Sequence, residues 1–420
     1  MNNLRTTESI AHFIQEYVKT HYPSDRITPL PDPVWQAIRD IGTELWLDTG
    51  DIEEARKLYT REFSALTTNN TLLNAEVQKG QYDSLVPAAA EVIQKALPGI
   101  SRQELLLEVA FVLNAVHGLR LTRLFDAYVS VELHTDLAHD VERSVAYGKR
   151  YFALCPERFI IKVPLTPAGY LAARKLIHEG IPVNFTLGFS VRQNYLAALL
   201  AKPTYVNVFM GRLNAYLADN HFGSGENAGE KVTLATQRTL QVLRAQGRTS
   251  TKLIGASMRN GAQVGKLAGL DVFTMPPKVA AQYHAQPDPL VKNHVSDDPD
   301  IPMAAGVTPE STNLKSLWDL PVAFTKVVEH LLHHPVESLT PEEIVEHFEE
   351  AEIGDFLPRW SDSDIETATK DGKIPVYEHW KDRLARGEIG LDALMNLSAL
   401  CSFTSDQKAL DDRVAGILGV

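Results

Sequence analysis

The sequence predicts an α/β protein, a (β/α)8 TIM barrel with N-terminal helices and a mainly helical C-terminal extension. Short β-rich runs alternate with longer helical stretches from residue 45 to residue 277, and this alternation is typical of βα units with parallel strands. Most runs are apolar on both faces, as strands covered on each side should be. Eight runs in about 230 residues favour a closed barrel over an open doubly wound sheet, the structural alternative.

The elements follow the chain in a regular order. The expected strands lie at residues 45–50, 63–69, 128–134, 159–165, 183–189, 204–210, 252–258 and 271–277. The expected wall helices include residues 137–154, 166–180, 190–201 and 229–247. We therefore assign a catalytic barrel to residues 41–288.

The segments on either side of the barrel are predicted to be helical. Residues 1–40 contain a helix, a proline-rich linker that begins at residue 23, and a second helix. Residues 289–420 lose the strand pattern and are expected to pack on the barrel as an extension. Within it, TPEEIVEHF (340–348) carries a helix-start signature: a threonine cap, a proline, and a glutamate three residues after the cap.

The composition argues against several classes of protein. The chain of 420 residues carries 53 acidic and 41 basic residues, a formal net charge of −12, without the basic cluster of a nucleic-acid binder. No apolar run approaches the ~20 residues that span a bilayer, and the N-terminus lacks a signal-peptide core. Cys155 and Cys401 are far apart in sequence, which fits a reducing cytoplasm. We expect a cytoplasmic protein without cofactor or metal.

Polar residues cluster late in the predicted strands. Active sites of TIM barrels form at the C-terminal ends of the strands, so these residues are the candidates for function. They are Asp48, Thr67, Thr68, Asn69, Glu132, Lys162, Asn184, Thr186, Asn207, Arg212, Ser257 and Arg259.

Lys162 is the most informative of them, because it lies inside the apolar strand sequence FIIKVP. Burying an unpaired ammonium is very unfavourable, so such a lysine tends to lose its proton. A neutral amine attacks a carbonyl to form an imine. The alternative is a lysine at a strand end that reaches water. Asp48 and Glu132, late in other strands, favour catalysis because they can handle protons; ion pairing is their alternative role.

Two loops predict an anion site. Arg212 follows the sixth strand, and Ser257 and Arg259 follow the seventh, at the expected starts of helices. Arginine side chains and helix N-terminal amides both bind phosphate. Surface salt bridges are the alternative for either arginine alone, but two arginines on adjacent loops favour a shared ligand.

Seven ordered segments resemble motifs of the transaldolase family. They are DTGDIE (48–53), LTTNNTLL (66–73), VSVEL (129–133), IIKVPLTPAG (160–169), VNFTLGFS (183–190), VFMGRLNAY (208–216) and ASMRN (256–260). SFTSDQKALDD (402–412) also resembles the C-terminal helix of that family. The resemblance implies a (β/α)8 barrel whose Schiff-base lysine lies on the fourth strand, where Lys162 lies.

The resemblance also implies roles for the other candidates. Asp48 would act as acid and base at the C4 hydroxyl of the substrate, while Glu132 and Thr186 would hold the catalytic water during imine formation. The implied substrate-binding residues are Asn69 and Asn184 for the dihydroxyacetone unit, Arg212, Ser257 and Arg259 for the phosphate, and Thr67 and Phe209 in the pocket wall. Asn207 stands where the family usually has a serine that touches substrate.

The implied activity is transfer of a dihydroxyacetone unit from sedoheptulose 7-phosphate or fructose 6-phosphate to an aldose phosphate, in the pentose phosphate pathway. The alternative is a lyase of the fructose-6-phosphate aldolase type, which uses the same imine but resembles short barrels with tyrosine at the position of Phe209. A barrel kept as a binding or scaffold protein is a third hypothesis. Asn70, where the family usually has proline, leaves donor specificity open, and a homodimer is expected from the family alone.

Four histidines of the extension, His330, His333, His334 and His347, raise the question of a metal site. No carboxylate–histidine spacing there repeats a known ligand motif, so we favour a solvated helix end. SDDPD (296–300) lacks the EF-hand pattern and is interpreted as an acidic loop.

Overall fold

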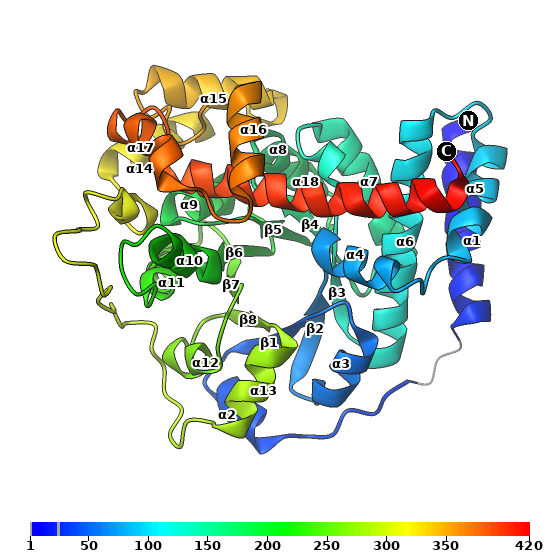
Figure 1. Ribbon diagram of the computed structural model, residues 1–420, viewed down its shortest axis with the longest axis horizontal. Helices are drawn as coiled ribbons and strands as arrows, with labels where there is room; N and C mark the ends of the chain where they lie inside the picture. Colours follow the sequence, from blue (N-terminus) through cyan, green and yellow to red (C-terminus); the bar gives the residue numbers. More distant parts are fainter. Residues whose placement is uncertain (1, 23–25) are drawn as a thin grey trace.

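In the computed structural model, eight parallel strands close into a barrel in chain order (Figure 1). The structure describes residues 2–22 and 26–420, with residues 2–6 in backbone only. The strands are β1 (Glu44–Asp48), β2 (Phe63–Thr67), β3 (Tyr128–Glu132), β4 (Phe159–Pro164), β5 (Val183–Thr186), β6 (Tyr205–Phe209), β7 (Lys252–Ala256) and β8 (Val272–Met275). The predicted barrel is confirmed, and the open-sheet alternative is wrong because β8 pairs with β1.

Each strand ends earlier than its predicted run. The polar residues that follow the apolar stretch leave the ladder and enter loops or helix caps. Asn69, for example, caps the next helix with its side-chain oxygen, which accepts from the N–H of Leu72. Every residue of β4 is buried, in keeping with a strand that the barrel core covers inside and helices cover outside.

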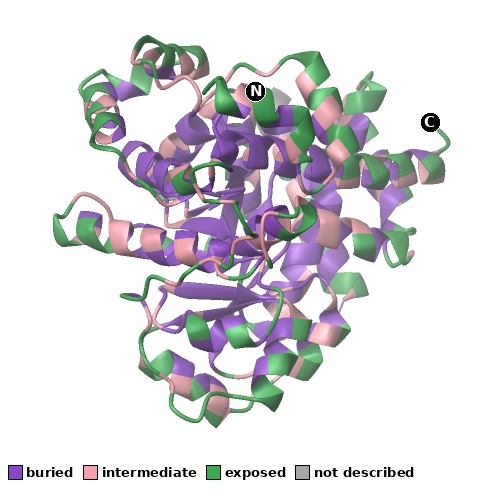
Figure 2. Cartoon of the chain, turned by 60° about the vertical axis from the view of Figure 1, so that its left-hand side comes forward, coloured by how far each residue is buried: buried purple, intermediate pink, exposed green. Residues whose placement is uncertain are grey.

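Helices surround the barrel and connect its strands (Figure 1). They are α3 (Ile52–Leu58), α4 (Asn70–Gln78), α5 (Leu85–Ala96), α6 (Arg102–Phe125), α7 (Val141–Leu154), α8 (Pro167–His178), α9 (Val191–Leu200), α10 (Met210–Asp219), α11 (Ala228–Ala245), α12 (Ala262–Lys266) and α13 (Pro277–Ala285), with a 3-10 turn η1 (Thr135–Leu137) after β3. Their apolar faces pack on the strands in one continuous core. Figure 2 accordingly shows the strands buried and the exposed residues on the outer helix faces and loops.

Among the described residues, α6 is the one helix that is long and apolar enough to cross a membrane, by length and composition. Its most apolar window is 89 % buried inside the protein. There α6 packs against α1, α5 and β3, so packing in the barrel wall accounts for its composition.

The two predicted N-terminal helices are present as α1 (Asn2–His21) and α2 (Pro33–Asp40). α1 packs on α5 and α6. α2 begins after Asp32, whose carboxylate accepts from the N–H of Val34. The first residues of the predicted proline-rich linker, 23–25, lie outside the described residues.

The extension is helical, as predicted. Its elements are η2 (Leu314–Leu317), α14 (Val322–Leu332), η3 (Val336–Ser338), α15 (Pro341–Glu350), α16 (Asp362–Asp371), α17 (Tyr377–Ala385) and α18 (Leu391–Leu418). The predicted helix start is confirmed, because Thr340 and Glu343 form a reciprocal capping box at α15. α18, red in Figure 1, runs across the molecule and packs on α4, α6 and α16.

A buried ion pair fastens the start of α18 to the barrel. Asp392 is fully buried, and its carboxylate accepts from Nη2 and Nε of Arg192 at 2.7 and 3.1 Å. Ser190, the N-cap of α9, donates its hydroxyl to the same carboxylate at 2.7 Å. Arg192 also donates to Asp355 at 3.0 Å, so one guanidinium joins a barrel helix to two segments of the extension.

Replacing Asp392 with alanine is expected to destabilise the protein by about 3–5 kcal/mol, because the buried guanidinium of Arg192 loses its main partner. Denaturant titration measures this as a fall in the free energy of unfolding. Asp382→Ala, at an exposed position of the same extension, is the matched control and should change stability by less than about 0.5 kcal/mol. Similar losses in the two variants would contradict the anchoring role of Asp392.

Candidate active site

A cavity of about 290 Å³ lies at the C-terminal ends of the strands. The predicted site residues that line it are Asp48, Thr67, Asn69, Lys162, Asn184, Asn207, Phe209, Arg212, Ser257 and Arg259. Glu132 and Thr186 are buried behind this lining. The barrel thus brings together side chains that are far apart in the sequence, at the end of the fold where such enzymes act.

Lys162 lies in the wall of this cavity, with its side chain 5 % exposed. Its Nζ donates to the carbonyl oxygen of Thr68 at 3.2 Å and lies 3.5 Å from Oε2 of Glu132. The ring centroid of Phe403 is 6.0 Å from Nζ. The amine is therefore buried in the cavity wall, and the alternative of a strand-end lysine that reaches bulk water is wrong.

Glu132 is the neighbour of Lys162 across the β3–β4 ladder. Burial raises the pKa of its carboxyl group, while Lys162 and the N–H of Asn70 act in the opposite direction. A void of about 10 Å³ borders Glu132, close to the space that one water molecule needs. Thr186 does not border this void, and its hydroxyl is enclosed without a hydrogen-bond partner among the described residues.

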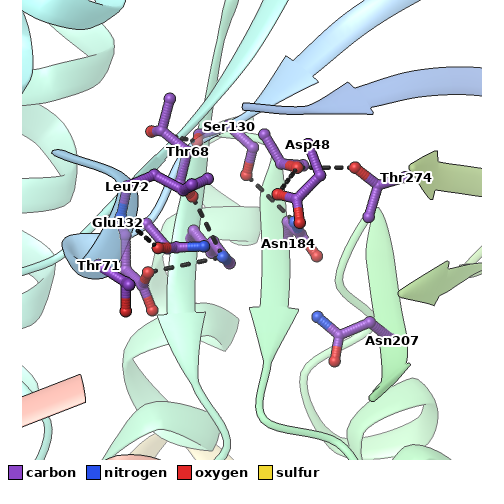
Figure 3. Close-up of polar contacts among 12 residues, drawn as sticks. Asp48, Thr68, Thr71, Leu72, Ser130, Glu132, Asn184, Asn207 and Thr274 are labelled. Carbon is purple, nitrogen blue, oxygen red and sulfur yellow. Dashed lines mark hydrogen bonds and ion pairs between the residues drawn. The ribbon is translucent and has the colours of Figure 1, made fainter. Parts of the chain in front are cut away.

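Asp48 ends β1 and belongs to a separate hydrogen-bonded group with two threonines (Figure 3). Thr67 donates its hydroxyl to Oδ1 of Asp48 at 2.6 Å, and the hydroxyls of Thr67 and Thr274 are 2.7 Å apart. Burial raises the pKa of the Asp48 carboxyl group, and the charges of Lys162 and Arg259 partly oppose this. A raised pKa makes a carboxyl group a better proton acceptor, as a general base requires.

Three asparagines line the cavity, and they differ in how many of their side-chain donors and acceptors are already hydrogen-bonded within the protein. Asn184 donates to Oγ of Ser130 at 3.1 Å, while its own Oδ1 is buried without a partner in the described part of the chain. Asn69 uses its side-chain oxygen to cap α4, which leaves its NH2 group for a ligand. The amide nitrogen of Asn207 donates to the carbonyl oxygen of Phe185 at 2.6 Å, and its oxygen accepts from the N–H of Gly188 at 3.2 Å. This geometry favours a structural role for Asn207.

Arg212 and Arg259 place two cations in the cavity wall. Gly211 permits the start of α10, which carries Arg212, to approach the loop that carries Arg259, since a Cβ at this position would lie 2.1 Å from the carbonyl oxygen of Ser257. Arg212 is buried, and burial together with the charge of Arg259 lowers its pKa to about 10. Two neighbouring guanidinium groups with little access to water favour binding of an anion between them.

The predicted contribution of helix N-terminal amides to this anion site is only partly correct. Arg212 does lie in the first turn of a helix, α10. Ser257 and Arg259 instead lie in the loop before α12, which is five residues long. The N–H groups of Arg259 and Asn260 both point to Oε1 of Gln263, at 2.6 and 3.3 Å. These amides are already satisfied, so on this loop only side chains remain available to an anion.

Sequence reasoning missed the part of the cavity that the extension supplies. Phe403 of α18 lines it, with its ring centroid 5.6 Å from the guanidinium carbon of Arg212. Lys373 and Ile374, in the turn after α16, line it as well, and the carbonyl oxygen of Lys373 accepts from Arg212 at 3.2 Å. Phe403 lies in the segment SFTSDQKALDD noted above, whereas nothing in the sequence around Lys373 indicates the contact.

The fold and the cavity are those of a barrel enzyme that acts at the carboxyl ends of its strands. Residues 45–339 match the family model described as Transaldolase/Fructose-6-phosphate aldolase. A transaldolase from Prochlorococcus marinus subsp. pastoris is 30 % identical over 256 residues, which cover 58 % of this chain and 74 % of the relative. A transaldolase from Xanthomonas euvesicatoria pv. vesicatoria is 31 % identical over 252 residues, 57 % of this chain and 74 % of the relative. A transaldolase from Gloeobacter violaceus is 30 % identical over 275 residues, which cover 64 % of this chain and 68 % of the relative.

The chain belongs to the transaldolase/fructose-6-phosphate aldolase family, as the resemblance of its motifs indicated. Its relatives identify it as an enzyme of the transaldolase kind. The matched region ends at residue 339, so α15 to α18, including Lys373 and Phe403 in the cavity wall, lie beyond it.

Proposed function

We propose that this enzyme transfers a dihydroxyacetone unit from a ketose phosphate, sedoheptulose 7-phosphate or fructose 6-phosphate, to an aldose phosphate. The transfer passes through an imine between the donor carbonyl and Lys162. The observation that carries this proposal is the position of Lys162, a buried amine in the wall of the cavity with a buried carboxyl group 3.5 Å away. We assign the reaction to the pentose phosphate pathway of the cytoplasm, with no cofactor.

Imine formation begins when the amine of Lys162 attacks the C2 carbonyl of the donor. The carbonyl oxygen leaves as water, so protons must reach it from a nearby group. We assign this relay to a water molecule held by Glu132 and Thr186 on the side of Lys162, and not to the small void behind Glu132, which Thr186 does not border. The raised pKa of Glu132 supports the assignment, because burial makes this carboxyl group a better proton acceptor than an exposed one.

Cleavage of the C3–C4 bond follows. Asp48 takes the proton of the C4 hydroxyl, the aldose phosphate leaves, and the electron pair of the broken bond passes into the iminium to give an enamine. An acceptor aldose phosphate then adds to this enamine by the reverse steps, and Asp48 returns the proton. Hydrolysis of the new imine frees Lys162. The separate hydrogen-bonded group around Asp48 supports this division of labour with Glu132.

A lyase that releases free dihydroxyacetone is the alternative function, because it needs only protonation of the enamine by water. Phe209 favours the transferase, since it has no hydroxyl with which to bind a water molecule beside the enamine. Its ring packs in an aromatic wall, 5.9 Å from the ring of Phe189 and 6.4 Å from that of Phe403, centroid to centroid. Such a wall keeps water from the enamine until an acceptor arrives.

Acceptor dependence tests the proposed function. With fructose 6-phosphate alone, the transferase should release one equivalent of glyceraldehyde 3-phosphate per active site and then stop. Addition of erythrose 4-phosphate should start continuous turnover. Continuous turnover with fructose 6-phosphate alone would support the lyase, and a failure of both conditions would contradict either function.

Arg259→Ala is expected to lower kcat/KM for phosphorylated acceptors by roughly ten- to a hundredfold, since a charge-assisted hydrogen bond contributes about 1.5–3 kcal/mol. Unphosphorylated glyceraldehyde should suffer a much smaller loss as acceptor. The measurement compares kcat/KM for glyceraldehyde 3-phosphate and glyceraldehyde, in the parent and in the variant. Equal losses for the two acceptors would mean that Arg259 supports structure, and the phosphate would have to bind elsewhere.

A further inference from the structure

The extension holds a second cluster of potential ligands, which the proposed function does not use. His330, His334 and His347 each offer a ring nitrogen, and the three nitrogens lie within 4.8 Å of one another. The ring centroids are 5.2 Å apart for His330–His334 and for His330–His347, and 5.6 Å apart for His334–His347. The sequence spacing favoured a solvated helix end, but α14 and α15 pack against each other and bring three of the four histidines together.

The backbone accounts for this arrangement. His330 lies in the last turn of α14, and His334 follows four residues later, where the helix has just ended. Residues four apart on a helix project from the same face, and a pair of histidines with this spacing is a common start of a metal site. His347, on α15, supplies the third ring from a different helix.

His347 has a second feature of metal-binding histidines. Its Nε2 lies 3.0 Å from the carbonyl oxygen of Val327. Because a carbonyl oxygen can only accept, Nε2 carries the hydrogen and Nδ1 keeps its lone pair. Metal-bound histidines usually donate from their other ring nitrogen to a carbonyl or a carboxylate, which fixes the tautomer and the ring orientation.

We infer that His330, His334 and His347 bind a zinc-class transition-metal ion, for which imidazole is a suitable ligand. Zn–N bonds of ~2.0–2.1 Å in a tetrahedron put the ligand nitrogens about 3.4 Å apart, so binding requires the rings to approach by about 1 Å. His330 and His334 are exposed, and their side chains can make this movement. Three protein ligands leave the fourth position to water.

The surroundings of the cluster suit a cation with a structural role. Glu343, fixed in the capping box of α15, lies one turn before His347 on the same helix and so places a carboxylate on the same face. α14 packs on α9 and α15 packs on α8, while none of the three histidines lines the barrel cavity. The bound ion would therefore join α14 to α15 and stabilise the extension without taking part in the transfer reaction.

Titration of the tag-free, full-length protein with zinc chloride tests this inference. Calorimetry should show one ion bound per chain, and the thermal unfolding midpoint should rise with zinc. His334→Ala removes an exposed side chain and should weaken zinc binding by at least about tenfold. Loss of a residue that merely hydrogen-bonds to a metal ligand already lowers metal affinity by roughly ten- to a hundredfold. Without zinc, this variant should unfold at the same temperature as the parent.

His333→Ala is the matched control, because His333 is exposed in the same turn but lies outside the cluster. It should bind zinc as the parent does. Equal weakening in His333→Ala and His334→Ala, or unchanged binding in His334→Ala, would overturn the inference. Absence of saturable binding at submillimolar zinc in the parent would overturn it as well.

Discussion

Lys162→Ala is expected to lower kcat/KM for dihydroxyacetone transfer by at least about a thousandfold, because the covalent path has no substitute once the amine is gone. Lys373, the other lysine that lines the cavity, belongs to an exposed turn of the extension and not to a buried strand. A coupled assay of aldose phosphate release measures the loss. Circular dichroism and the thermal unfolding midpoint check that the variant is folded.

Two further variants make this test specific. Lys162→Met keeps most of the side-chain volume in β4 and should be as inactive as the alanine variant. Lys373→Ala removes the second lysine of the same cavity and should still form the covalent intermediate. Activity of Lys162→Ala within about tenfold of the parent would contradict the role of Lys162 as nucleophile.

Asp48→Asn is expected to form the imine normally but to cleave the C3–C4 bond about 10²–10⁴-fold more slowly, the usual contribution of a general acid–base group. The amide keeps the shape of the carboxyl group and its hydrogen bond from Thr67, but it cannot take the proton of the C4 hydroxyl. Single-turnover release of glyceraldehyde 3-phosphate from fructose 6-phosphate measures the cleavage step, and reductive trapping measures the imine.

The outcome of trapping decides between two roles for Asp48. Normal trapping with slow release supports Asp48 at the C4 hydroxyl. Loss of trapping would mean that Asp48 takes part in imine formation, and the assignment of that step to Glu132 would be wrong. Thr274→Ala is the control, because it disturbs the hydrogen bonds around Asp48 but keeps the carboxylate, which Thr274 reaches only through Thr67. This variant should release product much faster than Asp48→Asn.

The barrel could be predicted because its physical signature is local. A strand covered on both faces is mostly apolar, and in β4 all six residues are buried and all but Lys162 are apolar. The strand ends could not be placed, because residues such as Asn69 are compatible with a strand by composition and leave it to cap a helix. The order of strands then followed from βα connectivity alone.

The cavity residues were predictable where one charge interrupts an apolar strand, as at Lys162, or where polar residues follow a strand. Contacts between distant segments gave no such signal. Phe403 reaches the cavity because Arg192 and Asp392 anchor α18, and Gln263 occupies the amides that were expected to bind phosphate. The four histidines were noted in the sequence, but the clustering of three of them was not predicted, because His347 joins the others only through the packing of α15 on α14.

Borohydride reduction in the presence of fructose 6-phosphate tests the central claim most directly, because it converts an imine into a stable amine on the lysine that formed it. Peptide mass spectrometry then locates the adduct. We predict a sugar-derived adduct on Lys162, absent without the sugar and absent from Lys373. An adduct on another lysine, or an active enzyme that forms no adduct under these conditions, would contradict the assignment of Lys162 as the Schiff-base lysine.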